Sequence, residues 1–192
     1  NTRAAIWDAM AARESFVTSG TRIKVRFFAG ADLPGQPADP RALVKQGYEK
    51  GVPMGGTISG ASKSPTFTVW ASKDPEGANL DRIQIIKGWV DAKGEPQDRT
   101  FDVAWSGDRK PGKSGKVPAV GSTVDLQKAT YTNEIGSGEL MGTWTDREFD
   151  PKQHAIYYVR VLEIPTPRFT TYDAVRNNLP LLEDVPATIQ ER

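Results

Sequence analysis

Cysteine is absent from this chain of 192 residues, and histidine occurs once. Without cysteine the chain has no disulfide framework, no thiolate metal site and no cysteine nucleophile. Catalytic zinc and manganese sites typically combine several histidines with carboxylates. We therefore interpret His154, at the start of an expected strand, as a surface residue. Metal ligation by His154 is the less favoured alternative.

The chain also lacks an excess of charge of either sign, because it has 25 basic and 24 acidic residues and a net charge of +1. Such a balance gives no electrostatic reason to bind nucleic acid or an anionic membrane surface. No stretch approaches the ~18 consecutive apolar residues of a membrane span. The opening segment NTRAAIWDAM is charged and amphipathic, unlike a secretory signal. We expect a soluble protein, cytoplasmic or periplasmic, with neither nucleic acid nor membrane as partner.

The residues that are present indicate a globular, mainly β protein. Apolar residues make up 38% of the chain and include five Trp, seven Phe and five Tyr, enough for a substantial core. A short N-terminal helix is expected after Thr2, with Ile6 and Met10 four residues apart on one face and Trp7 beside them. A Gly/Pro-rich excursion follows at 30–65. Within it, Asp39 is expected to cap a helical segment that stops at Gly47.

Short stretches with period-two alternation, separated by turn signals, predict six to eight strands. They are IKVRFFA, TFTVWA, LDRIQIIKGWV, RTFDVAWS, ATYTN, GELMGTWTD and AIYYVRVLE. This pattern favours an immunoglobulin-like β-sandwich with a short N-terminal helix and an irregular C-terminal extension. The last strand, 155–163, is apolar on both faces, which suits a central strand or one covered on its outer face. It ends at Pro165 and Pro167, and a short helix is expected from Thr171.

Candidate catalytic groups are scattered rather than gathered in a motif. Asp74, Glu76 and Asp81 are spaced loosely like a calcium loop but lack the full EF-hand pattern. We favour a polar turn between two strands. Ser62 and Lys63 resemble a Ser–Lys pair only superficially. A hydrolase that uses paired carboxylates and no metal stays open as an alternative, although nothing favours a particular pair.

Tryptophans provide the other candidate site. A carbohydrate- or ligand-binding sandwich could use such rings as a stacking platform. At strand spacing, tryptophans are more often core or interface residues. The candidates are Trp70, Trp89, Trp105 and Trp144.

Longer segments resemble a family of bacterial PHP-like metallohydrolases, of the polymerase and histidinol phosphatase superfamily. The segment TRAAIWDAMAARESFVTSGTRIKVRFF resembles the region that closes the catalytic barrel of that family. The segments GVPMGG, PTFTVWASKDPEGANLDRIQIIKGW, TVDLQKATYTNEIGSGEL and YYVRVLEIPTPRFTTYDAVR are similar to its C-terminal β-sandwich. The resemblance covers Thr2 to Arg192. The family is largely of unknown function, with arylsulfatase-like and phosphatase-like relatives.

The resemblance implies that the chain is a C-terminal piece of such an enzyme. Residues 1–22 would be the closing helix and turn of an upstream barrel, 23–163 the β-sandwich, and 164–192 a docking turn, short helix and tail. The metal-binding residues of the family lie in the barrel. The resemblance therefore assigns no catalytic residue, metal ligand or cofactor to this chain and expects zinc or manganese in the barrel. It also implies that the family chain continues past TIQER into a further strand-forming segment.

The resemblance also implies which residues meet the barrel. Arg168 and Arg176 would pair with carboxylates or reach toward an anionic ester at the barrel mouth. Arg22 and Tyr172 are the further candidates for docking on the barrel or contacting an anion. Surface ion pairs of little energetic value are the alternative for the arginines. The expected apolar interface consists of Ile6, Trp7 and Met10, and its exposure predicts self-association.

We therefore predict that the chain alone is a non-catalytic accessory or scaffold domain. The resemblance implies that the whole protein is a PHP-like, metal-dependent hydrolase. It would hydrolyse a sulfate or phosphate ester with metal-activated water.

Overall fold

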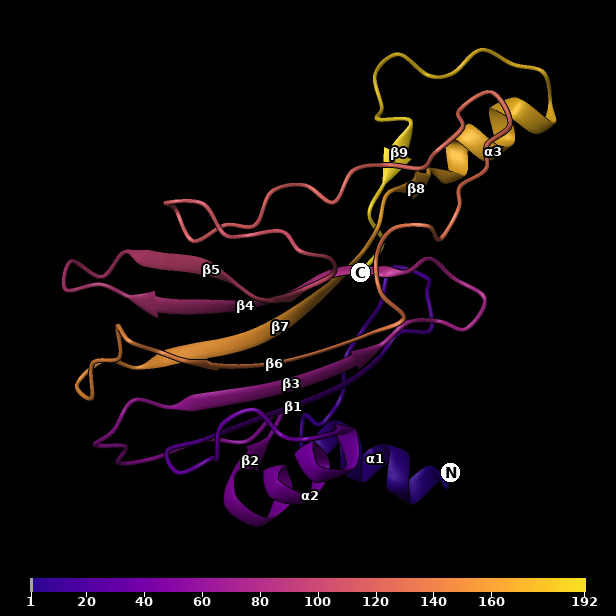
Figure 1. Ribbon diagram of the computed structural model, residues 1–192. Helices are drawn as coiled ribbons and strands as arrows, with labels where there is room; N and C mark the ends of the chain where they lie inside the picture. Colours follow the sequence, from indigo (N-terminus) through magenta and orange to yellow (C-terminus); the bar gives the residue numbers. More distant parts are fainter. Residues whose placement is uncertain (1) are drawn as a thin grey trace.

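Two facing antiparallel sheets form the body of the protein, whose computed structural model describes residues 2–192 (Figure 1). In chain order the elements are α1 (Arg3–Ala11), β1 (Lys24–Gly30), α2 (Pro40–Lys50), β2 (Val52–Pro53), β3 (Thr66–Ser72), β4 (Leu80–Val90), β5 (Pro96–Trp105), β6 (Glu139–Thr145), β7 (Ala155–Glu163), β8 (Thr166–Pro167), α3 (Phe169–Arg176) and β9 (Thr188–Ile189).

The first sheet has the strand order β2-β1-β3-β6, and the second has the order β5-β4-β7. Every pair of neighbouring strands is antiparallel. Hydrophobic side chains from both sheets meet between them and form the core. The predicted mainly β sandwich, with a short N-terminal helix and an irregular C-terminal extension, is confirmed.

Alternation of side chains explains how the strands bury one face. In β1, Val25 and Phe27 are buried, whereas Lys24 and Arg26, which alternate with them, are exposed. Each such apolar side chain contributes roughly 1.5–3 kcal/mol when it is fully removed from water. The core of the sandwich consists of Ile23, Val25, Phe27, Phe67, Val69, Ala71, Leu80, Ile83, Ile85, Ala104, Leu140 and Val161.

The position of β7 decides between two interpretations that the sequence left open. The central strand is excluded, because β4 is the central strand of its sheet and β7 lies at an edge. Its inner face packs on the core through Tyr157 and Val159. On its outer face, Ile156 and Tyr158 are 69% and 47% exposed. Apolar side chains on both faces therefore do not place a strand at the centre of a sheet.

Helix α2 covers the outer face of the first sheet, where Leu43 packs with Phe28 in a second small core. Asp39 accepts a hydrogen bond from the backbone N–H of Ala42 and caps the helix, as predicted. The helix does not stop at Gly47 but continues to Lys50. A Cβ atom at Gly47 would lie 2.4 Å from the ring of Phe28. This glycine therefore permits close packing rather than ending the helix.

Beyond the sandwich, β8 pairs with β9, and α3 begins two residues before the predicted Thr171. The predicted strand GELMGTWTD is β6, whereas ATYTN forms only an isolated bridge between Asp125 and Thr130. The helices within residues 2–192 are all too short or too polar to cross a membrane.

Candidate docking site at one end of the sandwich

Three segments far apart in sequence meet where β7 ends. They are the linker 18–22, which precedes β1, the turn 73–77 between β3 and β4, and the tail 189–192. Together with Glu163 they make up a cluster that we call the joint. Ser19 N donates to the carbonyl of Arg192 over 2.7 Å, and Glu163 N donates to the carbonyl of Glu191 over 2.8 Å. The joint thus ties the start of the sandwich to the tail.

Arg22 anchors the linker on the turn. Its guanidinium donates to both carboxylate oxygens of Asp74, each over 3.0 Å, and its backbone N–H donates to Asp74 over 2.9 Å. Glu76 accepts a further bond from the same guanidinium. These hydrogen bonds from Arg22 lower the pKa of Asp74 to about 2. The side chain of Arg22 is 66% exposed, so the ion pair orients the linker more than it stabilises the fold.

Glu163 is buried at the centre of the joint, with 2% of its surface exposed. Burial raises the pKa of Glu163 to about 7. A hydrogen bond with Thr21 opposes this rise in pKa, whereas the charges of Glu191 and Asp74 add to it. Among residues 2–192, its Oε1 atom has no hydrogen-bond partner. A carboxyl in this state is protonated in a substantial fraction of molecules near neutral pH.

Gln190 attaches the tail to the sandwich. Its side-chain amide donates to the carbonyl of Glu163 over 2.8 Å and to Oδ2 of Asp81 over 2.9 Å. Asp81 is fully buried and also lies within 2.7 Å of Arg82 and Arg109. The three carboxylates spaced like a calcium loop therefore have other partners. In the part of the chain that the structure describes, no three His, Asp or Glu side chains come together as a metal site.

The two predicted arginines, one at the N-cap of α3 and one in its last turn, lie against aromatic rings. Arg176 stands 5.8 Å from the centre of the Tyr172 ring, and Arg168 stands 5.9 Å from that of Phe169. Within residues 2–192 neither arginine forms an ion pair, and Arg168 Nε is buried without a hydrogen-bond partner. Burial raises the pKa of Tyr172. The contact of these residues with a further domain stays a prediction.

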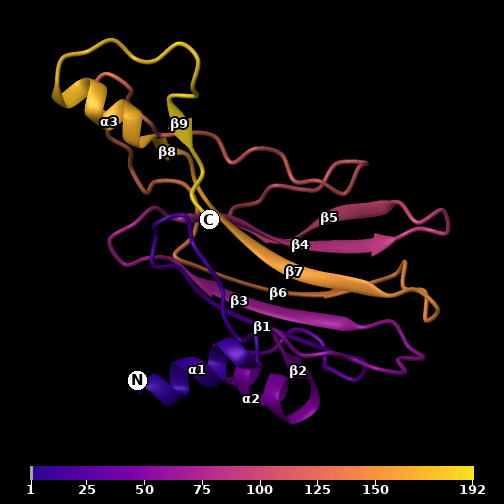
Figure 2. The ribbon, with the colours of Figure 1, turned by 180° about the vertical axis from the view of Figure 1, so that it is seen from behind.

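The predicted apolar interface lies on α1, none of whose residues is buried. Ile6, Trp7 and Met10 are 57%, 67% and 55% exposed. Figures 1 and 2 show that α1 lies beside α2 outside the first sheet, toward the same end of the sandwich from which α3 projects, with the C-terminus between the two helices. All of the predicted contact residues therefore lie on α1, on α3 with its N-cap, or in the joint.

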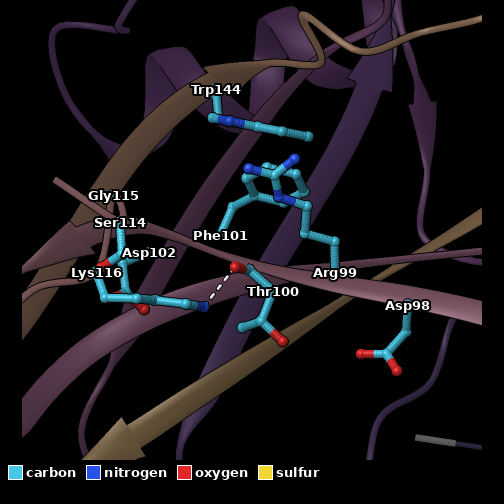
Figure 3. A pocket seen from close by; sticks show the side chains of 9 residues that line it. All are labelled: Asp98, Arg99, Thr100, Phe101, Asp102, Ser114, Gly115, Lys116 and Trp144. Carbon is cyan, nitrogen blue, oxygen red and sulfur yellow. Dashed lines mark hydrogen bonds between the residues drawn. The ribbon is translucent and has the colours of Figure 1, made fainter.

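The four candidate tryptophans do not form one platform. Trp70 packs beside α2, and the indole N–H of Trp105 donates to the carbonyl of Arg109 over 2.7 Å. Trp144 alone lines an open pocket of about 470 Å³, where its ring lies 4.5 Å from that of Phe101 (Figure 3). Lys116 in the wall of this pocket donates to the carbonyl of Thr100.

Reasoning from the sequence missed a buried polar network at the opposite end of the sandwich. Lys87 Nζ and Tyr157 OH each donate to Oδ2 of Asp146 over 2.6 Å, and both charged side chains are buried. Glu148 N completes the carboxylate's set of donors over 2.9 Å. The single clue in the sequence is a lysine inside the apolar strand segment IQIIKGWV.

Comparison with known proteins gives one finding on the family. The model of a family described as "Protein of unknown function (DUF3604)" matches residues 1–192. No curated protein and no solved structure matches the chain.

Proposed function

The chain belongs to the DUF3604 family, and from this premise we propose that it is a non-catalytic accessory domain that docks a PHP-like catalytic barrel. The barrel meets the end of the sandwich that carries α1, the joint and α3. The whole protein hydrolyses a sulfate or phosphate ester with water activated by zinc or manganese in the barrel. No step of that chemistry involves a residue of the sandwich, which braces the barrel.

The exposed helix α1 is the observation that carries this proposal. It has nine residues and buries none of them. Isolated helices shorter than about 12–15 residues are marginal in water, and most helices in proteins are stabilised by packing an apolar face. Covering Ile6, Trp7 and Met10 would contribute roughly 1.5–3 kcal/mol for each side chain. A docked domain supplies the surface that α1 lacks.

Expression with additional upstream sequence tests the catalytic half of the proposal. Metal content and the hydrolysis of aryl sulfate and aryl phosphate are measured on this chain and on one extended upstream through its native coding sequence. We expect metal and turnover in the extended protein alone. Turnover by residues 1–192 would contradict the proposal, and turnover that survives chelation would favour the metal-independent carboxylate alternative.

Two matched substitutions test the docking half in the extended protein. Trp7→Glu puts a charge on the proposed interface, whereas Val90→Glu changes a residue that is also exposed but lies at the far end of β4. We expect Trp7→Glu to speed proteolysis of the segment 12–22 and to separate the unfolding of the sandwich from that of the barrel. Equal behaviour of the two variants would contradict docking at α1.

The pocket beside Trp144 is the reason to keep carbohydrate binding as a second candidate. Trp144 shares the lining of this pocket with Lys116 and Asp98, so that the pocket offers an aromatic ring and polar groups for a sugar ring. A glycan array with the parent chain and Trp144→Ala tests it. Binding that Trp144→Ala removes but Trp70→Ala retains would support this function. An array without any bound glycan would eliminate it.

A further inference from the structure

Lys87 and Asp146 form an ion pair that is closed off from water. Their side chains are 3% and 0% exposed, and Lys87 Nζ lies 2.6 Å from Asp146 Oδ2. Within residues 2–192, every other ion pair between a lysine and a carboxylate lies at the surface. Burying two charges costs about as much as their attraction returns. Moving one proton across the short hydrogen bond removes both charges and leaves an amine beside a carboxylic acid, which are the reactive forms for making an amide.

The groups around Asp146 meet the requirements of acyl transfer. Oδ1 accepts a hydrogen bond from the backbone N–H of Glu148 over 2.9 Å, so a negative charge that develops on this oxygen has a donor in place. Oδ2 accepts from the hydroxyl of Tyr157 over 2.6 Å, which supplies a proton donor for an oxygen that leaves. Burial and the hydrogen bond to Asp146 raise the pKa of Tyr157, so its hydroxyl keeps its proton. The amine is held in place as well, because Lys87 Nζ donates to the carbonyl of Glu148 over 2.9 Å.

Asp81 provides a comparison within the same molecule. It is also fully buried, but its partners are the guanidinium groups of Arg82 and Arg109. A guanidinium in a protein stays protonated and offers no lone pair to attack a carboxyl group. A lysine amine is a nucleophile once it has lost its proton. Of these two buried carboxylates, Asp146 alone therefore faces a group that can be acylated.

We propose that Lys87 and Asp146 become joined by an amide bond in the folded protein, with Tyr157 as the catalytic proton donor. Nζ of the neutral lysine attacks Cγ of the protonated aspartate, and the electron pair of the C=O bond moves onto Oδ1. Tyr157 then gives its proton to the Oδ2 hydroxyl and takes one from Nζ. The bond between Cγ and Oδ2 breaks, Oδ2 leaves as water, and the C=O bond to Oδ1 forms again. One ammonium and one carboxylate thus give one amide and one water, without an oxidant or a further reactant.

The position of the two residues gives the bond a structural role. Lys87 lies on β4, the central strand of the second sheet, and Asp146 directly follows β6 of the first sheet. The bond would therefore link the two sheets covalently. Folding brings the two groups together and supplies the high effective concentration that amide formation needs. The bond forms after folding, so freshly folded protein holds the ion pair. This inference does not rest on the proposed function, because it uses neither α1 nor the joint.

The mass of the intact chain tests the reaction. The purified chain is kept folded at neutral pH for days, and samples are denatured and weighed by mass spectrometry. We expect a growing fraction that is lighter than the 21.0 kDa chain by about 18 Da, the mass of one water. The double variant Lys87→Met/Asp146→Leu lacks both reacting groups and should keep its full mass. A parent chain that keeps its full mass throughout would overturn the proposal.

Peptide mapping distinguishes the proposed bond from other losses of water, such as the closure of an aspartate onto its own backbone. Trypsin does not cut after an acylated lysine. The product should therefore be one branched peptide made of residues 83–93 and 129–147, linked through Lys87 and Asp146. In urea the two groups are apart, and no branched peptide should form. Loss of water without this peptide, or its formation at the same rate in urea, would contradict the inference.

Two matched substitutions test the part played by Tyr157. Tyr157→Phe removes the hydroxyl at Asp146, whereas Tyr158→Phe removes a hydroxyl from the next residue, on the outer face of β7. We expect the branched peptide to form roughly a hundredfold more slowly in Tyr157→Phe, because the proton donor is lost. Tyr158→Phe should react like the parent chain. Circular dichroism checks that both variants are folded. Equal rates in the two folded variants would overturn the role of Tyr157.

Discussion

The buried carboxylates at the two ends of the sandwich differ in how completely they are hydrogen-bonded. At one end Asp146 accepts hydrogen bonds from Lys87, Tyr157 and Glu148 N–H, which satisfy its charge. At the other end Glu163 is as inaccessible, yet one of its oxygens has no partner among the described residues. A satisfied network fixes one geometry, whereas an unsatisfied group leaves its surroundings sensitive to pH and to binding.

Breaking the satisfied end should have the largest effect. Asp146→Ala leaves the ammonium of Lys87 buried without its counter-charge, and we expect a loss of about 3–5 kcal/mol in the free energy of unfolding. Urea denaturation measures it. The double variant Lys87→Met/Asp146→Leu should recover most of the loss, because it removes both charges. A loss below about 1 kcal/mol for Asp146→Ala would show that the pair contributes only what a surface pair does.

Removing the charge at the joint should have the next largest effect, and its sign depends on pH. The pKa of Glu163 is about 7 in the folded protein, against 4.5 for an unperturbed glutamate. The folded state thus binds more protons than the unfolded state between these values. Stability should fall as the pH rises from about 4.5 to about 7, by up to about 1.4 kcal/mol per pH unit and about 3 kcal/mol in total.

Glu163→Gln should flatten this decline and stabilise the protein above pH 7, since an uncharged amide takes the place of a buried carboxylate. Glu183→Gln, at an exposed position, is the control and should leave the decline unchanged. The pKa of Asp74 is lowered to about 2, so its contribution is present above about pH 4 and lost only as the pH falls toward 2. The pH range over which Glu163 changes the stability therefore does not overlap with that of Asp74. An unchanged slope in Glu163→Gln would contradict the assignment.

Loosening the tail should have the smallest effect of the three. Gln190→Ala removes two hydrogen bonds that hold the tail, at a cost of about 1–2 kcal/mol. Hydrogen exchange at the backbone N–H groups of Ser19 and Glu163 should speed up, while exchange in β4 stays slow. Gln127→Ala, at an exposed position, should leave all of these rates unchanged. A uniform acceleration across the molecule would mean that the joint is part of the global folding unit.

The sequence predicted the features that depend on neighbouring residues. Alternation identified β1, β3 and β4 with their buried faces, and Asp39 was correctly expected to cap α2. The same local signal could not decide the place of β7, because an edge strand and a central strand can both be apolar on two faces. It also misread Gly47 as a helix stop. A glycine is needed there because the ring of Phe28, which lies on a different element, leaves no room for a Cβ atom.

The joint and the buried network could not be predicted from local pattern. Lys87 and Asp146 are 59 residues apart, and Ser19 and Arg192 are 173 apart. Nothing in the neighbourhood of either residue indicates its partner. Among the candidate site residues, Arg22 was expected to meet the barrel, whereas within the described residues its guanidinium is paired with Asp74 and Glu76 of the sandwich itself. The buried state of Glu163 follows from packing alone.

The bonds between Ser19 and Arg192 also have a mechanical consequence. A force that pulls the linker away from the tail is first opposed by the hydrogen bonds that join these two residues. While they hold, little tension reaches the strands of the sandwich. The joint therefore bears a force applied between the linker and the tail, and the sheets are not strained by it.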